Sequence, residues 1–289
     1  MTLDQLFPDE DYGFRLRFEQ SPAAEFFVAS EQREGILGER QRWLRDTPTK
    51  CMAVLPEAAP LLEETLSLAK EFSGEQELPP GGAHRLYGGD RAGPAMDALP
   101  QRDLPEQVLK LGECWEPDFL LLKAAAEGQI RLLAGCVCFP SSWSLEEKIG
   151  RPIEEIHEPV PGLNVAIGPQ IHRFLSKLRP NTAWLRSNWG LSRSPELNQH
   201  PWRRLPRLDA TVGADEIWLR VENQALVSLP GSGGILFGIR IANYPFTAMT
   251  SNPDLARRLS RALETMPEAV ARYKGIAPAR ERLIELMRV

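Results

Sequence analysis

The sequence predicts an α+β protein in which an antiparallel sheet of about five strands is flanked by N-terminal helices and a C-terminal helix. Apolar residues recur at helical spacing before residue 112 and again after residue 251. Between these regions, five apolar or alternating runs have the length of strands. Short glycine-bearing connections join two pairs of these runs, which is typical of antiparallel hairpins.

The composition indicates a globular protein and excludes several classes of partner. Hydrophobic residues make up 43% of the 289 residues and charged residues 25%. The net charge is −5 and the lysines and arginines are dispersed, which argues against a nucleic-acid partner. No apolar run approaches the ~20 residues that a membrane span needs, and the acidic start does not resemble a secretory signal. We therefore expect a cytoplasmic protein.

Residues 1–112 are expected to form a helical N-terminal region. Within them, the residues between 78 and 94 are rich in glycine and proline and predict a long loop, in which His84 is a surface residue. The apolar positions of three other segments repeat at helical spacing, with charges on the remaining faces. The helices are expected at 30–46, 57–72 and 104–111.

Residues 113–250 contain the apolar and alternating runs that predict the strands of the sheet. Gly128 supplies a turn position in the first predicted hairpin, and a Gly-Ser-Gly-Gly run joins the last two strands. A short helical turn ends near His157, and a further helix is expected at 168–178. The strands are expected at 118–125, 130–139, 182–192, 216–230 and 234–244.

Residues 251–289 are expected to form a C-terminal helical segment. A capped amphipathic helix starts at Asn252, and Pro267 and Gly275 interrupt it.

The four cysteines, Cys51, Cys114, Cys136 and Cys138, are expected to be reduced. No CxxC pair is present, and only two of the four are close in sequence. This spacing favours structural thiols in a cytoplasmic protein over a disulfide framework or a zinc site.

Two predicted strands carry polar residues in a row on one face. Arg220, Glu222 and Gln224 alternate with apolar residues on one strand, and Arg186 and Asn188 share a face of another. One interpretation is that both faces are solvated. The other is that they line a pocket, where a carboxylate among guanidinium groups stays ionised and binds a cation or polarises a bound oxygen.

His157 lies at the end of a short amphipathic turn, followed by Pro159 and Pro161. One interpretation is a helix cap or a hydrogen-bonded core histidine. The other is an axial metal ligand, because the prolines fix the backbone that aims the imidazole. A single histidine is too few for zinc, whereas haem iron needs only one protein ligand. His172 is the rival ligand, and His200 is expected on the surface.

Three segments, "KIGRPIEEIHEPVPG" from residue 148, "LRSNWGL" from residue 185 and "LRVENQALVSLPGSGGILFGIRIANYP" from residue 219, resemble the haem-dependent oxidative N-demethylase family. The resemblance runs from about Phe119 to Pro245. One departure is Asn223, which replaces an arginine of the family pattern. The resemblance implies a PAS-like haem-binding domain over residues 113–250, with haem b and with His157 as the axial ligand of its iron.

The resemblance also implies a reaction and a set of site residues. The family removes a methyl group from a secondary amine such as dimethylamine with O2, giving a primary amine and formaldehyde, and takes its electrons from NADPH. Glu222 is then the counter-charge for the ammonium, and Arg186 and Arg220 polarise bound oxygen. The catalytic set implied is Glu222, Arg186, Arg220 and Gln224, and the cofactor-binding set is His157, Trp143, Asn188 and Trp189.

The sequence contains neither a nucleotide-binding G-x-G-x-x-G between a strand and a helix nor a four-cysteine iron–sulfur pattern. Electrons are therefore expected from another polypeptide. This agrees with the family's reductase and tetrahydrofolate-binding subunits, which carry FMN, a [2Fe–2S] cluster and tetrahydrofolate, in a hetero-oligomer. Two alternatives are a PAS-type haem-based gas or redox sensor and a binding module without haem. The chain has no heptad run of the kind that a sensor's output coiled coil requires, which favours the enzyme.

Overall fold

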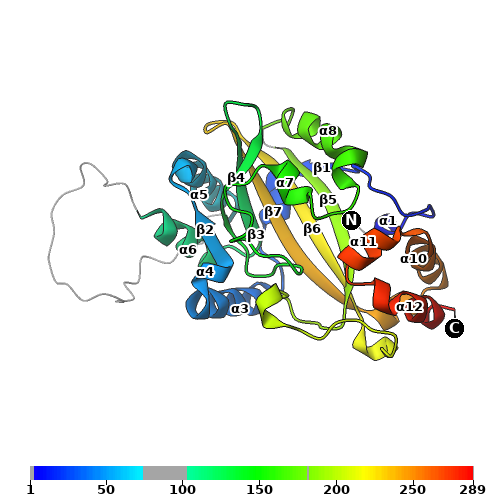
Figure 1. Cartoon of the computed structure of the whole chain (residues 1–289). Coiled ribbons are helices and arrows are strands. Elements are labelled where there is room, and N and C mark those ends of the chain that lie inside the picture. The colour runs from blue at the N-terminus through cyan, green and yellow to red at the C-terminus, as the bar shows by residue number, and fades with distance from the viewer. Residues whose placement is uncertain (1–2, 74–102, 181, 289) are drawn as a thin grey trace, which may run out of the picture.

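The computed structural model describes residues 3–73, 103–180 and 182–288, and a seven-stranded antiparallel sheet forms its centre (Figure 1). The strand order is β1-β5-β6-β7-β3-β4-β2. The strands are β1 (Glu19–Pro22), β2 (Met52–Val54), β3 (Asp118–Ala124), β4 (Ile130–Cys136), β5 (Thr182–Ser192), β6 (Trp218–Leu229) and β7 (Gly234–Pro245). The predicted α+β class is confirmed. The predicted number of about five strands was too low, because the short edge strands β1 and β2 come from the region expected to be helical.

The five predicted strands are all present, and the predicted hairpins are those of β3 with β4 and of β6 with β7. β6 and β7 pair along their whole length, from Trp218 opposite Pro245 to Leu229 opposite Gly234. Gly128, between β3 and β4, has a φ of +81°, a conformation that favours glycine and that its place in the hairpin predicted.

The helices surround the sheet, with α7 and α8 on the viewer's side in Figure 1. Their bounds are α1 (Leu3–Leu6), α2 (Ala23–Phe27), α3 (Arg33–Asp46), α4 (Pro48–Cys51), α5 (Ala59–Ser73), α6 (Leu104–Cys114), α7 (Ile153–His157), α8 (Leu163–Leu175), α9 (Phe246–Thr250), α10 (Pro253–Thr265), α11 (Glu268–Tyr273) and α12 (Arg280–Leu286). Within the described ranges, every helix is too short or too polar to cross a bilayer.

Successive side chains of each strand point to opposite sides of the sheet, and its two faces pack against different helices. On β3, Phe119 and Leu121 are buried in one core with α2, α3, α5 and α6, whereas Leu120 and Leu122 belong to a second core under α7 and α8. By the same alternation, the predicted polar residues of β5 and β6 lie on the second face, with Trp184 and Leu226.

A third core holds the C-terminal helices against the ends of β5 and β6. The side chain of Asn252 accepts hydrogen bonds from the first N–H groups of α10, as its predicted capping role requires. Pro267 and Gly275 divide the predicted single helix into α10, α11 and α12. We call residues 7–17 the N-terminal strap; the backbone N–H of Tyr12 in this segment donates to Thr265 Oγ1 of α10. Asp9 and Asp11 of this strap form ion pairs with arginines of that helix.

The structure also bears on the predicted start of the helix at 168–178 and on the predicted state of the cysteines. α8 begins at Leu163, five residues before the predicted start at Gly168, and continues through Pro169. Pro169 is exposed, so the hydrogen bond that proline removes from the helix is lost on the solvated side. All four cysteines are free thiols, as predicted. The predicted loop at 78–94 and His84 lie outside the described residues.

Candidate functional site

A cavity of about 530 Å³ lies between the sheet, α7, α8 and the N-terminal strap. This volume falls in the range of roughly 300–1,000 Å³ that small-molecule and cofactor sites occupy. One part of its wall is apolar and the other is polar. The apolar part includes Leu120, Leu122, Leu132, Ile153, Ile167, Ile171, Leu226 and Phe237. The polar part includes Arg186, Asn188, Glu222, Gln224 and Lys274.

His157 lines this cavity from the C-terminal end of α7. Pro159 and Pro161 occupy the tight connection to α8, and Gly162 completes it with a φ of +77°. No hydrogen bond joins the imidazole to another of the described residues. Burial lowers the pKa of His157 to about 4, and the charges of Arg186 and Lys148 act in the same direction. His157 is therefore a neutral imidazole at physiological pH, which is the form that binds a metal.

The structure separates His157 from the other histidines. His172 is not among the residues that line the cavity, and its Nε2 donates to the carbonyl oxygen of Gly128 at 2.8 Å. His200 is buried, so its predicted surface position was wrong. Its Nε2 lies 3.2 Å from a carboxylate oxygen of Glu146, and its Nδ1 accepts from the backbone N–H of Trp202. These local partners account for its burial.

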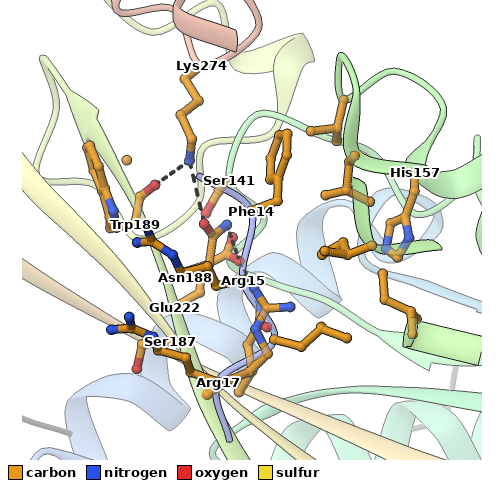
Figure 2. Close-up of a pocket in the computed structure, with 18 of the residues that line it drawn as sticks. Phe14, Arg15, Arg17, Ser141, His157, Ser187, Asn188, Trp189, Glu222 and Lys274 are labelled. Atoms are coloured by element: carbon orange, nitrogen blue, oxygen red, sulfur yellow. Dashed lines mark hydrogen bonds between the residues drawn. The ribbon is translucent and has the colours of Figure 1, made fainter. Parts of the chain in front are cut away.

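The polar part of the wall is built by the pairing of β5 with β6. Asn188 lies opposite Glu222 and Arg186 lies opposite Gln224, so all four side chains come to one face of the sheet. The Oε2 of Glu222 accepts from Gln224 Nε2 at 2.9 Å and from Asn188 Nδ2 at 3.4 Å. Figure 2 shows Asn188 and Glu222 on one side of the cavity and His157 on the other. The predicted polar faces therefore line a pocket rather than meet bulk solvent.

Arg186 brings a positive charge to this group without a fixed partner. No hydrogen bond or ion pair joins its guanidinium to another described residue. Burial lowers the pKa of Arg186, and the carboxylate of Glu222 opposes that effect. Because Arg186 also lowers the pKa of His157, the two side chains are close enough to interact across the cavity. A ligand held between them would meet an imidazole on one side and a guanidinium on the other.

Arg220 also lines the cavity, but its guanidinium is largely occupied. Its Nε donates to Ser141 Oγ at 2.6 Å, and its terminal nitrogens donate to the carbonyl oxygens of Phe139, Leu197 and Glu196. Burial lowers the pKa of Arg220 to about 10, so it stays charged at pH 7. These bonds join the segment after β4 to the segment after β5.

Lys274 is a cavity residue that the sequence analysis missed. Its Nζ donates to the carbonyl oxygen of Trp189 at 2.6 Å and lies 3.5 Å from Asn188 Oδ1 (Figure 2). Burial lowers the pKa of Lys274 to about 8, Glu222 raises it and Arg186 lowers it. A lysine just after a short, interrupted helix reads as a solvated residue, and no signal in the sequence places it beside β5.

The remaining predicted residues have clear positions. Trp143 and Trp189 both line the cavity, and the ring of Trp189 packs 5.0 Å from that of Phe7 in the strap. Asn223, the departure from the family pattern, is not among the lining residues; its Oδ1 accepts from Ser187 Oγ at 2.8 Å. All eight predicted site residues are therefore brought to one cavity.

The comparison with known families bears directly on this cavity. The family model described as haem-dependent oxidative N-demethylase, alpha subunit-like, matches residues 87–284. The chain belongs to this family. The matched region contains His157, the polar groups of β5 and β6, and Lys274. At the level of the family, the prediction of a haem-dependent oxidative N-demethylase alpha subunit is confirmed. The N-terminal strap precedes the matched region.

Proposed function

We propose that this chain is the haem-binding subunit of an oxygenase that removes a methyl group from a small secondary amine, with dimethylamine as the substrate. The observation that carries the proposal is the placement of His157 and Glu222 in one cavity of a chain that belongs to this family. The products are a primary amine and formaldehyde. With NADPH as the electron source the reaction balances: dimethylamine, O2, NADPH and a proton give methylamine, formaldehyde, water and NADP⁺.

The residues present fit haem b. A cavity with an apolar wall would suit the porphyrin, and the neutral imidazole of His157, which has no hydrogen-bond partner among the described residues, would hold the iron. Bound haem would supply the activation of O2. The antiparallel sheet with α7 and α8 over one face supports the PAS-like assignment of the haem-binding region, for which we keep the bounds 113–250.

Glu222 is the residue that we assign to the ammonium group of the substrate. The other carboxylates that line the cavity, Glu10 and Asp11, form ion pairs with arginines. Glu222 is in no such pair, and only its Oε2 has a hydrogen-bond partner among the described residues. Because an unpaired buried cation is costly, a carboxylate with an open oxygen is the natural site for an alkylammonium ion.

The other polar residues have supporting roles in this proposal. Arg186 faces the cavity without a fixed partner and stabilises negative charge that develops on oxygen. Gln224 and Asn188 hold the carboxylate of Glu222 in place through their amide groups. Arg220 holds the cavity wall together rather than reaching into it, because carbonyl groups occupy its donors. Trp143 and Trp189 close the walls.

Electrons and the released formaldehyde are handled by other subunits in this proposal. The family description names an alpha subunit, which supports an assembly of several chains. We assign FMN and a [2Fe–2S] cluster to a reductase subunit and tetrahydrofolate to a further subunit. The family match favours this enzyme over the haem-based sensor.

The test is an optical titration of the purified chain with haem and then with dimethylamine. We expect His157→Ala to abolish stoichiometric haem binding, because it removes the imidazole that would hold the iron. His172→Ala, whose ring hydrogen-bonds Gly128 outside the cavity, should keep the wild-type Soret band. Loss of the band in the His172 variant alone would contradict the ligand assignment. A wild-type chain that binds no haem would overturn the proposed function.

A further inference from the structure

The N-terminal strap holds a carboxylate between two arginines beside the cavity. Arg15 Nη2 lies 2.7 Å from one carboxylate oxygen of Glu10, and Arg17 Nη2 lies 2.8 Å from the other. All three residues line the cavity, and Figure 2 shows Arg15 and Arg17 on the segment that passes through the site. Each oxygen of this carboxylate has its own guanidinium. The strap thus contains a formed site for one carboxylate group.

The other cations of the cavity are less suited to bind a second anion. Lys148 donates to the carbonyl oxygen of Ile156, and Lys274 donates to that of Trp189. Arg220 is surrounded by carbonyl oxygens, as described above. Arg186 lies beside Glu222 in the polar wall, which the proposed function assigns to the substrate and to oxygen. Arg15 and Arg17 are therefore the cations of the cavity that are best placed to bind an anionic group of a ligand.

The exposure of the two arginines also suits a charged group at the rim of the cavity. The side chains of Arg15 and Arg17 are 37% and 52% exposed. Haem b has an apolar ring and two propionate carboxylates, which lose least hydration where water still reaches them. A rim with two guanidinium groups allows the ring to be buried while the carboxylates stay partly solvated.

We propose that Arg15 and Arg17 bind the propionate carboxylates of the haem and release Glu10 when they do so. This inference rests on the proposed function, because it assumes that the cavity holds haem. It assigns a cofactor contact to a segment outside the family match at 87–284. It also gives Glu10 a definite role as the carboxylate that occupies the arginines before the cofactor arrives.

The strap keeps its position by contacts that do not involve these arginines. Asp9 pairs with Arg257 at 2.8 Å, and the backbone N–H of Tyr12 donates to Thr265 Oγ1 at 2.8 Å. A change at Arg15 and Arg17 therefore leaves the anchors to α10 intact. The charges of Arg15 and Arg17 can therefore be removed without changing the position of the strap.

The experiment compares haem with haem dimethyl ester, which keeps the ring and the iron but has neutral propionate groups. Apoprotein is titrated with each, and the Soret absorbance gives the dissociation constant. The proteins are wild type, the double variant Arg15→Gln/Arg17→Gln, Glu10→Gln, and the control Arg45→Gln, whose side chain is 72% exposed on α3. Thermal unfolding of each apoprotein confirms that it is folded.

We expect the double variant to bind haem roughly tenfold more weakly than wild type, the effect of two partly exposed ion pairs. With the ester, the two proteins should bind equally. Glu10→Gln should bind haem more tightly than wild type, because it removes the competing carboxylate. The control should match wild type with both ligands.

Two outcomes would overturn the inference while the proposed function stands. In the first, the double variant binds haem as tightly as wild type does. In the second, it loses the same factor for haem and for the ester, so that the arginines act on the shape of the cavity and not on the carboxylates. Absence of haem binding by wild type would overturn the proposed function and this inference together.

Discussion

Glu222 and His157 line the same cavity, but their proposed roles require different charge states. His157 must be neutral to offer a nitrogen lone pair, and burial together with two nearby cations keeps it so. Glu222 must hold a negative charge, and two amide groups donate to one of its oxygens while the other stays open. The difference in polarity between the two walls is therefore what allows one cavity to hold both the metal ligand and the cation site that we propose.

The charge of Glu222 is tested by Glu222→Gln, which keeps the size and shape of the side chain. Loss of a buried charge partner typically costs ~3–5 kcal/mol. We expect the variant to keep its haem spectrum and to bind dimethylamine roughly two to three orders of magnitude more weakly. An optical titration measures both constants, with Glu57→Gln on the exposed surface as the control. Equal constants for wild type and Glu222→Gln would place the ammonium elsewhere.

We expect Lys274 to make the proposed binding of the amine depend on pH. Below about pH 8 its ammonium is charged and repels a second cation at Glu222, and above about pH 8 that repulsion disappears. We expect the affinity of the wild-type protein for dimethylammonium to rise by up to roughly tenfold between pH 7 and pH 9, the factor that about 1.4 kcal/mol represents. The measurement is the same optical titration at the two pH values.

Lys274→Met should bind the amine at pH 7 as tightly as wild type does at pH 9. Lys110→Met, which changes an exposed lysine of α6, is the control and should keep the pH dependence. If the ratio between the two pH values is the same in wild type and Lys274→Met, Lys274 does not act on the cation site.

At the scale of the elements, two buried arginines join segments of the chain around the sheet. Arg220 of β6 joins the segments after β4 and β5. On the opposite face of the sheet, Arg40 of α3 forms a buried ion pair with Asp118, the first residue of β3. Asp118 also accepts from the backbone N–H groups of Cys138 and Phe139. Helix α3 is thus fixed to β3 and to the segment that follows β4.

Arg40→Met should lower the free energy of unfolding by about 3–5 kcal/mol, because it leaves the carboxylate of Asp118 buried without its counter-charge. Urea denaturation of the apoprotein measures the change. The double variant Arg40→Met/Asp118→Asn should recover part of that loss, since it removes the unpaired charge as well. A double variant less stable than Arg40→Met would contradict this account.

Sequence patterns predicted the elements that are long enough to show several repeats of their apolar spacing. The five long strands and helices α3, α5, α6 and α10 each show several repeats of their apolar spacing. β1 has four residues and β2 has three, which is too short for an alternation to stand out. Their place in the sheet depends on pairing with β5 and β4, and a local pattern does not contain that information.

The same distinction applies to the candidate site. Glu222, Arg186 and His157 stand out locally, as polar residues on an apolar strand or as a histidine before two prolines. Lys274 and the strap arginines reach the cavity only through the packing of chain segments that are distant in sequence. The resemblance to the family covered the first group and not Arg15 or Arg17, which precede the region that matches.

At the scale of the whole molecule, the proposed reaction needs more than this chain. The cavity contains the residues that we assign to the cofactor and the amine, whereas the sequence has no nucleotide-binding fingerprint with which to accept electrons from NADPH. We expect the haem-loaded chain alone to give no sustained demethylation with NADPH, measured as formaldehyde released. Reduction of the haem by dithionite under carbon monoxide is the control that the iron is competent. Sustained NADPH-dependent turnover by the pure chain would refute the assignment of electron transfer to partners.

The anchors of the N-terminal strap also set an order of events during protein synthesis. Asp9 and its partner Arg257 are 248 residues apart, and α10 is among the last elements to be made. At roughly 5–20 residues per second, the ribosome needs about 12–50 s to travel from one to the other. The last strand of the cavity wall, β7, ends at Pro245, so the interval in which these strands exist and the strap is unfastened covers only the residues from Pro245 to Arg257, roughly 1–2 s at the same rate. We therefore expect the proposed cofactor to bind mostly to the finished chain, with the strap already in place.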